Sequence, residues 1–198
     1  MKRCITLLSL GLCLAAPMLS QGMEIKPLIH VTNVHNGQYD EALDAITDTK
    51  FYGPYQFRVL KDAVETKGET KDIDGRAFRT SDDVFMHVKA RSIDSSTISL
   101  DKEIKKIVKE RTVPEPTVKM VLPVKYDVIE VNNDGVRSLL AEFMYGWPLN
   151  YRTDMVLISD YEDTRYYYNL QFYRQKLPEG VRVEQLRQMI MDAYFSYK

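Results

Sequence analysis

Apolar residues recur every three or four positions in two segments of the chain, which is the spacing of one face of a helix. Residues 99–111 carry such a stripe, with Ser99 as the expected N-cap and acidic residues in the first turn, where the helix dipole favours negative charge. Residues 181–197 give the strongest helix signal, with Leu186 and Ile190 in the middle of the stripe. A shorter helix is predicted over residues 38–48. Five residues of the C-terminal helix are expected to face water: Arg182, Glu184, Arg187, Gln188 and Asp192.

Strands are predicted where apolar and polar residues alternate or where apolar runs are bounded by turn residues. The second half of the chain gives the longer signals, which read as two hairpins, the second joined near Glu162 and Asp163. Gly53-Pro54 and the Asn132–Gly135 segment supply turns. The expected strands are residues 24–32, 55–60, 84–90, 117–128, 136–145, 154–161 and 165–174.

Consecutive strands flanked by helices favour an α+β fold over a wound parallel sheet. We expect an antiparallel sheet of about four to six strands with helices packed on one face and the C-terminal helix closing the domain. A chain of 198 residues fits one domain of this kind, which we place at residues 23–198.

The first 22 residues have the three-part layout of a secretory signal peptide. A basic start is followed by an apolar run at residues 5–16 and by small residues up to Gly22, so cleavage is expected before Met23 or before Gln21. The apolar run is shorter than the roughly 20 residues that span a bilayer, so no transmembrane anchor is expected. The sequence therefore predicts a periplasmic or secreted protein after cleavage of the signal peptide.

Both cysteines, Cys4 and Cys13, lie inside the expected signal peptide. The mature chain would then have no disulfide and no thiol chemistry. Small secreted domains of eukaryotes usually carry disulfides, so their absence favours a bacterial protein. Leu12 is too bulky for the position before a lipid-modified cysteine, which argues against lipidation of Cys13.

The charge balance removes one class of partner. Lys and Arg number 27 against 28 Asp and Glu, for a formal net charge of −1. Nucleic-acid binding normally needs a basic stripe that neutralises phosphates, so no nucleic acid is expected. The unusual figure is 13 tyrosines beside a single tryptophan.

Motifs for phosphate loops, nucleophile elbows and zinc-binding helices are absent, so no cofactor and no metal are expected. Asp40 and Asp44 share a helix face beside His35, but a solvated acidic first turn explains them better than a cation site. A hydrolase with dispersed catalytic residues stays open as an alternative. Its candidates are Ser81, Ser92, Ser95, Ser96 and His87 for a triad, and Asp160, Glu162 and Asp163 for a carboxylate pair.

The strand over residues 165–174 carries the strongest candidate for binding. One of its faces is apolar enough for the core, with Tyr166, Tyr168, Leu170 and Phe172. The other face mixes aromatic rings with amides, which suits sugars or peptides because rings cover apolar surface and amides satisfy polar groups. Packing of aromatic residues within the sheet would explain the same pattern. The candidate binding residues are Arg165, Tyr167, Asn169, Gln171 and Tyr173.

The sequence thus predicts a non-catalytic exported protein of the cell envelope that binds a partner protein, peptide or glycan through this face. The alternative is an envelope-acting hydrolase.

Overall fold

The computed structural model describes residues 29–32, 41–66, 75–113, 122–146 and 151–196. The expected signal peptide, with both cysteines, lies outside these residues. Within the described residues, no helix is long and apolar enough to cross a membrane.

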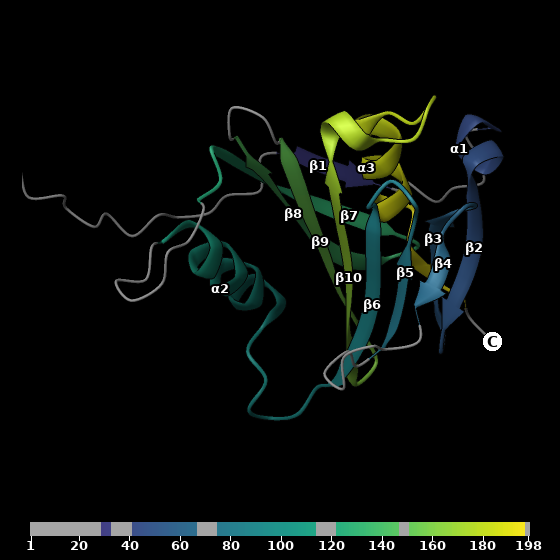
Figure 1. Ribbon diagram of the computed structural model, residues 1–198. Helices are drawn as coiled ribbons and strands as arrows, with labels where there is room; N and C mark the ends of the chain where they lie inside the picture. The colour runs from purple at the N-terminus through teal and green to yellow at the C-terminus, as the bar shows by residue number, and fades with distance from the viewer. Residues whose placement is uncertain (1–28, 33–40, 67–74, 114–121, 147–150, 197–198) are drawn as a thin grey trace, which may run out of the picture.

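The molecule is built around a sheet of eight strands in the order β1-β7-β8-β9-β10-β6-β5-β4 (Figure 1). The four strands from β7 to β10 form an antiparallel meander, and β1 joins its edge parallel to β7. The strands span β1 Ile29–Thr32, β4 Val64–Thr66, β5 Arg76–Arg79, β6 Phe85–Ser92, β7 Lys125–Asn133, β8 Val136–Tyr145, β9 Arg152–Tyr161 and β10 Thr164–Tyr173.

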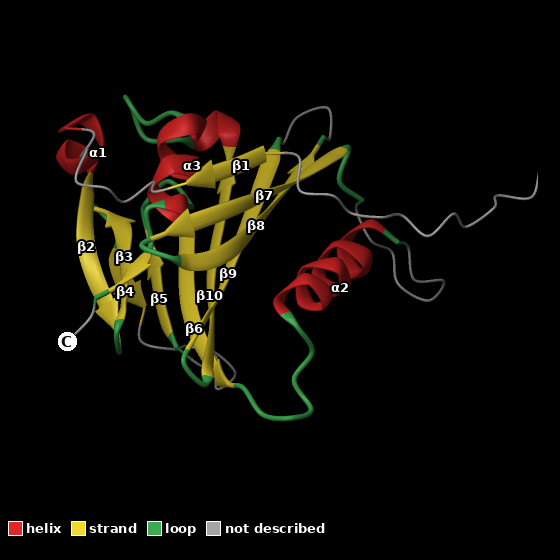
Figure 2. Ribbon diagram, turned by 180° about the vertical axis from the view of Figure 1, so that it is seen from behind, coloured by secondary structure: helices red, strands yellow, loops and turns green. Residues whose placement is uncertain are grey.

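A second, small sheet and two of the described helices, α2 (Leu100–Thr112) and α3 (Val183–Met191), flank the large sheet (Figure 2). The small sheet has the order β11-β3-β2, with β2 Thr47–Tyr52, β3 Tyr55–Leu60 and β11 Tyr194–Phe195. Helix α2 packs on one face of the large sheet, whereas α3 and the small sheet pack on the other. The short helix α1 (Glu41–Ile46) leads into β2, and a 3-10 turn at Arg174–Lys176 follows β10.

The expected α+β fold with a mostly antiparallel sheet is confirmed, but two details are wrong. The large sheet has more strands than four to six, and helices cover both of its faces. The central strands explain why both faces are covered. On β8, Leu140 points into one core, while Leu139 and Ala141 point into the other. A sheet that is apolar on both faces needs cover on both.

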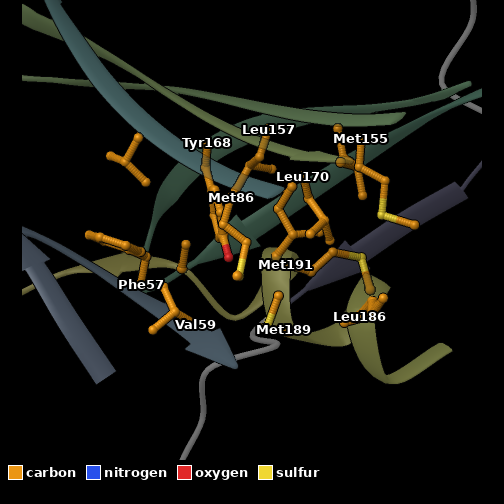
Figure 3. Packing of buried hydrophobic residues seen from close by; sticks show 14 of the residues in the cluster. Phe57, Val59, Met86, Met155, Leu157, Tyr168, Leu170, Leu186, Met189 and Met191 are labelled. Carbon is orange, nitrogen blue, oxygen red and sulfur yellow. The ribbon is translucent and has the colours of Figure 1, made fainter. Parts of the chain in front are cut away.

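The larger core lies between the large sheet, the small sheet and α3 (Figure 3). Tyr168 and Leu170 of β10 meet Phe57 of β3 and Ile190 of α3, all at most 1% exposed. The rings of Phe57 and Tyr168 pack edge to face at 5.6 Å between centroids. Leu186 and Ile190 are fully buried, so the predicted apolar stripe of the C-terminal helix is confirmed.

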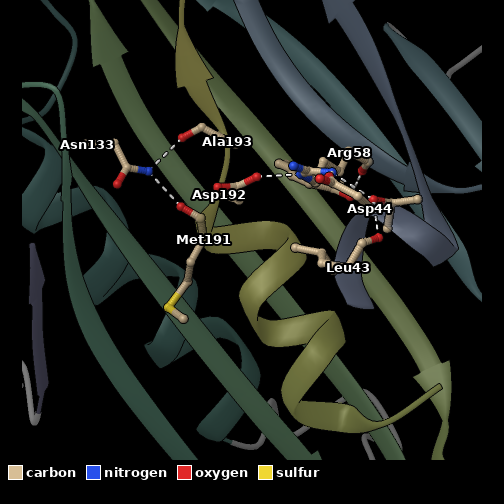
Figure 4. A network of polar contacts seen from close by, with 9 residues as sticks. Leu43, Asp44, Arg58, Asn133, Met191, Asp192 and Ala193 are labelled. Atoms are coloured by element: carbon tan, nitrogen blue, oxygen red, sulfur yellow. Dashed lines mark hydrogen bonds and ion pairs between the residues drawn. The ribbon is translucent and has the colours of Figure 1, made fainter. Parts of the chain in front are cut away.

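That helix is shorter than predicted because polar contacts end it (Figure 4). Its last turn is followed by Asp192, which accepts a hydrogen bond from Arg58 of β3, and Arg58 also donates to Asp44 and Thr47. Asn133 of β7 donates to the carbonyl oxygens of Met191 and Ala193 at 2.7 and 2.9 Å. The chain then pairs with β3 as strand β11.

Two residues that were expected to face water, Asp192 and Arg187, are buried and half-buried, respectively. Asp192 is only 8% exposed, because Arg58 neutralises it inside the protein. Arg187 reaches across to Glu142 of β8 and donates two hydrogen bonds, at 2.8 and 3.0 Å. Glu142 is 1% exposed, so α3 carries the charge that compensates a buried carboxylate.

Candidate functional site

The pairing of β10 places the candidate binding residues on the face covered by α2. In the antiparallel register, Tyr167 lies opposite Lys89 of β6 and Ile158 of β9, and Ile158 and Tyr167 belong to the core under α2. Side chains directly opposite each other share a face, so Arg91, Lys89, His87 and Phe85 of β6 line up beside the candidates of β10.

Helix α2 covers only part of this face. Its buried stripe of Leu100, Ile104 and Val108 packs on residues of β7, β8 and β9, and Tyr167 is the one β10 residue of that core. The neighbouring surface of β6 and the rest of β10 carries polar side chains instead. The helix therefore forms one wall of a groove, and β10 with β6 forms the floor.

Arg165 and Tyr167 lie at the closed end of this floor. They are 2% and 8% exposed, so most of each side chain is covered. Arg165 donates to both carboxylate oxygens of Asp160, at 2.6 and 2.8 Å, and its Nη1 is 3.7 Å from Glu103 of α2. The Tyr167 hydroxyl donates to Glu103 at 3.2 Å. These contacts tie the first turns of α2 to the sheet.

Asn169, Gln171 and Tyr173 continue along the floor and are half-buried. Gln171 donates to Asp154 of β9 at 3.4 Å, and the Lys176 ammonium lies 5.5 Å from the centre of the Tyr173 ring. These side chains keep polar atoms at a surface that solvent reaches in part.

Each of the five candidate residues lines at least one of three hollows along β10. The largest, about 870 Å³, lies between α2 and β6 and includes Tyr167 and Asn169 in its lining. A hollow of about 190 Å³ at the start of β10 touches Arg165 and Tyr167, and one of about 460 Å³ at its end touches Gln171 and Tyr173. We call the largest of these hollows the α2 groove. It is lined by His87, Lys89, Arg91, Glu103, Lys106, Glu110, Arg111, Tyr167, Asn169 and their neighbours.

Asp154 is one polar residue of this face that sequence reasoning missed. It is 1% exposed and accepts hydrogen bonds from Arg152 at 2.6 and 2.8 Å and from Arg111 of α2 at 3.1 Å. Arg111 also lies 4.8 Å from the centre of the Phe143 ring. The carboxylate thus anchors the last turn of α2. The sequence offered a signal, since Asp154 is an acid at the start of an apolar strand, but its partner Arg111 lies 43 residues away in the chain.

The protonation of the site follows from its burial. Burial raises the pKa of the Tyr167 hydroxyl above its usual 10.0, and the nearby Glu103 carboxylate raises it further. The hydrogen bond with Asp160 raises the pKa of Arg165 above its usual range. Tyr167 is therefore a neutral donor and Arg165 a fixed cation at physiological pH.

Some of the residues considered for catalysis or for a cation site make other contacts or lie apart. Asp160 accepts hydrogen bonds from Nε and Nη2 of Arg165, and Asp44 accepts a hydrogen bond from Arg58. His87 and Ser92 both line the α2 groove, but five residues of extended strand separate them by about 16 Å. His35 and Asp40 lie outside the described residues, and among those that are described no three His, Cys, Asp or Glu side chains form a metal-binding group. Ser99 precedes α2, yet its side chain makes no capping hydrogen bond.

Comparisons with known proteins leave the function open. No family model matches the chain, and no curated protein matches it. Among solved structures, it is similar to a protein of Bacteroides thetaiotaomicron VPI-5482 whose crystal structure extends to 1.50 Å resolution, with 11% sequence identity and a TM-score of 0.46. The alignment covers 77% of this chain and 49% of that one, so this chain spans about half the length of its neighbour. We draw no conclusion from a likeness at this level.

Proposed function

We propose that this protein is a non-catalytic exported protein of the cell envelope that binds a partner protein, peptide or glycan at the face of β10 described above. One observation carries the proposal: each of Arg165, Tyr167, Asn169, Gln171 and Tyr173 lines one or more of three hollows that follow one another along β10.

The floor has the chemistry of a recognition surface. Its half-buried amides, Asn169 and Gln171, offer donors and acceptors, and cations surround them. The buried end is held rigid by Arg165 and Tyr167, which order α2 through Glu103. Preorganised walls lower the entropy that binding must overcome. Glu103 and Asp154 are engaged in holding α2, so these carboxylates support the groove.

Crosslinking in the native envelope tests the proposal. A photoreactive phenylalanine analogue replaces Glu110 of α2, which is exposed and lines the α2 groove. The control places it at Lys61, an exposed residue in the turn after β3. A discrete adduct at position 110 that is absent at position 61 supports binding at this face. Equal adducts at both positions, or none at position 110, would contradict it.

Export is a separate part of the proposal, supported by the basic, apolar and small-residue order of residues 1–22. N-terminal sequencing of the protein from periplasmic and secreted fractions should read from Met23 or Gln21. Full-length chain that retains Met1 in the cytosol, or a lipid on Cys13, would show that this part is wrong.

A further inference from the structure

Positive charge gathers around the candidate site. The three hollows along β10 are lined by eight basic and three acidic side chains. The whole chain, by contrast, carries 27 basic and 28 acidic residues. The face is therefore a local concentration of cations on a protein that is close to neutral.

Several of these cations have acidic partners, but two at the α2 groove do not. Asp154 compensates Arg111 and Arg152, Asp83 compensates Arg79 and Lys176, and Asp160 compensates Arg165. Lys89 and Arg91 of β6 are exposed, and neither has an acidic partner among the described residues. Lys106 faces them from α2, with Glu110 as a loose partner at 3.9 Å.

The aromatic rings of the site already hold ammonium groups. The Lys89 Nζ lies 5.2 Å from the centre of the Tyr167 ring, and the Lys176 Nζ lies 5.5 Å from that of Tyr173. A cation over a ring is attracted to its electron-rich face. The rings therefore position cations at the floor, and they offer less open surface to stack against a neutral sugar.

The remaining features favour a glycan over a peptide. The site is a sheet face, where the backbone groups are already paired within the sheet, so it offers no free edge along which a peptide could add as a strand. Apolar side chains in the α2 groove are few, with Ile107 and Val156 the largest, which does not suit the apolar face of a helix. The half-buried amide of Asn169 suits the hydroxyl groups of a sugar.

From these observations we infer that the α2 groove binds an acidic glycan, with Lys89, Arg91 and Lys106 contacting the carboxylates of its sugar units. The inference rests on the proposed binding function and names its ligand class. Carboxylate groups placed between these side chains would form charge-assisted hydrogen bonds, which are stronger than neutral ones.

Fluorescence anisotropy with two labelled uronic-acid oligomers, oligogalacturonate and oligomannuronate, tests the inference at about 0.15 M salt, where the Debye length is about 8 Å. We expect the full chain to bind at least one of them, and the Lys89→Gln/Arg91→Gln variant to bind it about tenfold or more weakly. Added NaCl should weaken binding, because salt screens exposed charges. A labelled malto-oligosaccharide, which is neutral, should not bind.

A matched variant controls for net charge. Lys102→Gln/Lys109→Gln removes the same two charges from exposed positions of α2 that line none of the three hollows. Its affinity should stay within about twofold of the unchanged chain, since exposed charges beyond the groove are screened. All four residues are exposed, so thermal midpoints of both variants should match that of the unchanged protein.

Three results would overturn the inference. The first is failure of both uronic-acid oligomers to bind, and the second is an equal loss of affinity in the control variant. The third is labelled hexaglutamate binding as tightly as the glycans with the same sensitivity to Lys89 and Arg91, which would assign the groove to an acidic peptide. If crosslinking at position 110 still gives a discrete adduct, only the ligand class is wrong and the binding function stands.

Discussion

The two faces of the eight-stranded sheet are covered in different ways. On one face, α3 and the small sheet close over a core of 24 buried hydrophobic residues. On the other, α2 buries a cluster of 10 among the described residues. Polar contacts with Glu103, Arg111 and Asp101 hold that helix at its ends.

The difference shows why the groove lies where it does. A helix of 13 residues is about 20 Å long and cannot shield a sheet of eight strands. The strands β10 and β6 therefore keep a polar surface beside α2, while their opposite side is sealed by apolar packing. One face of the sheet provides stability, and the other has room for a ligand.

The largest expected effect comes from making the same substitution, isoleucine to alanine, in each of the two cores. Ile190→Ala removes a fully buried side chain from the larger core and should lower the free energy of unfolding by about 3–4 kcal/mol. Ile104→Ala in α2 should cost about 2 kcal/mol, because a smaller cluster beside a groove can relax around the cavity. Urea denaturation measures both. Equal losses would mean that the two faces contribute alike.

Arg187→Ala tests the buried charge on the α3 face. After this substitution, the remaining cation near Glu142 among the described residues is Arg174, at 3.9 Å. We therefore expect the free energy of unfolding to fall by about 2 kcal/mol. Lys102→Ala, an exposed cation on α2, should stay within about 0.5 kcal/mol.

The double variant Arg187→Ala/Glu142→Gln then identifies the cause. It should regain part of the loss, because the amide needs no cation. If Arg187→Ala unfolds at the same urea concentration as the unchanged protein, the pair is a surface contact of little value.

Hydrogen exchange compares the two helices directly. Amides of α2 should exchange about tenfold or more faster than those of α3, because local opening of α2 exposes the smaller cluster. Asp154→Asn should widen the gap by weakening the hold on Arg111, while α3 keeps its protection. Similar protection in both helices would show that α2 opens only with the whole domain.

The smallest effect concerns the first turn of α2. Hydrogen bonds from Arg137 lower the pKa of Asp101 below its usual 3.8. Since the folded pKa is depressed, the contribution of this pair is fully present above about pH 4 and is lost as the pH falls through the folded pKa. Asp101→Asn should therefore cost at most about 0.5 kcal/mol at pH 7.

Stability measured from pH 7 to pH 2 should show the difference between Asp101→Asn and the unchanged chain shrinking in acid. A difference that stays constant below pH 3.8 would mean that the carboxylate charge of Asp101 contributes nothing.

The sequence by itself determined the local elements whose pattern is complete within one segment. The strand at residues 55–60 and the strand at 136–145 have the predicted bounds, and α2 differs by one residue at each end. The alternation along residues 165–174 also separated an apolar face from a mixed face, and the structure places Tyr168 and Tyr167 in different cores accordingly. These features depend on near neighbours along the chain, which a sequence displays directly.

Tertiary structure alone decided what depends on distant partners. Strand β2 has the mostly polar sequence TDTKFY and forms because β3 pairs with it. Helix α3 ends at Met191 because Arg58 binds Asp192 and because the following residues pair with β3 as strand β11. Arg165 and Tyr167 are buried because Asp160 and Glu103 satisfy them from another strand and from α2. Burial of a polar side chain requires a partner, and the partner here lies up to 64 residues away in the chain. Local periodicity carries no record of such pairs, so the groove could be found only once the helix was seen on the sheet.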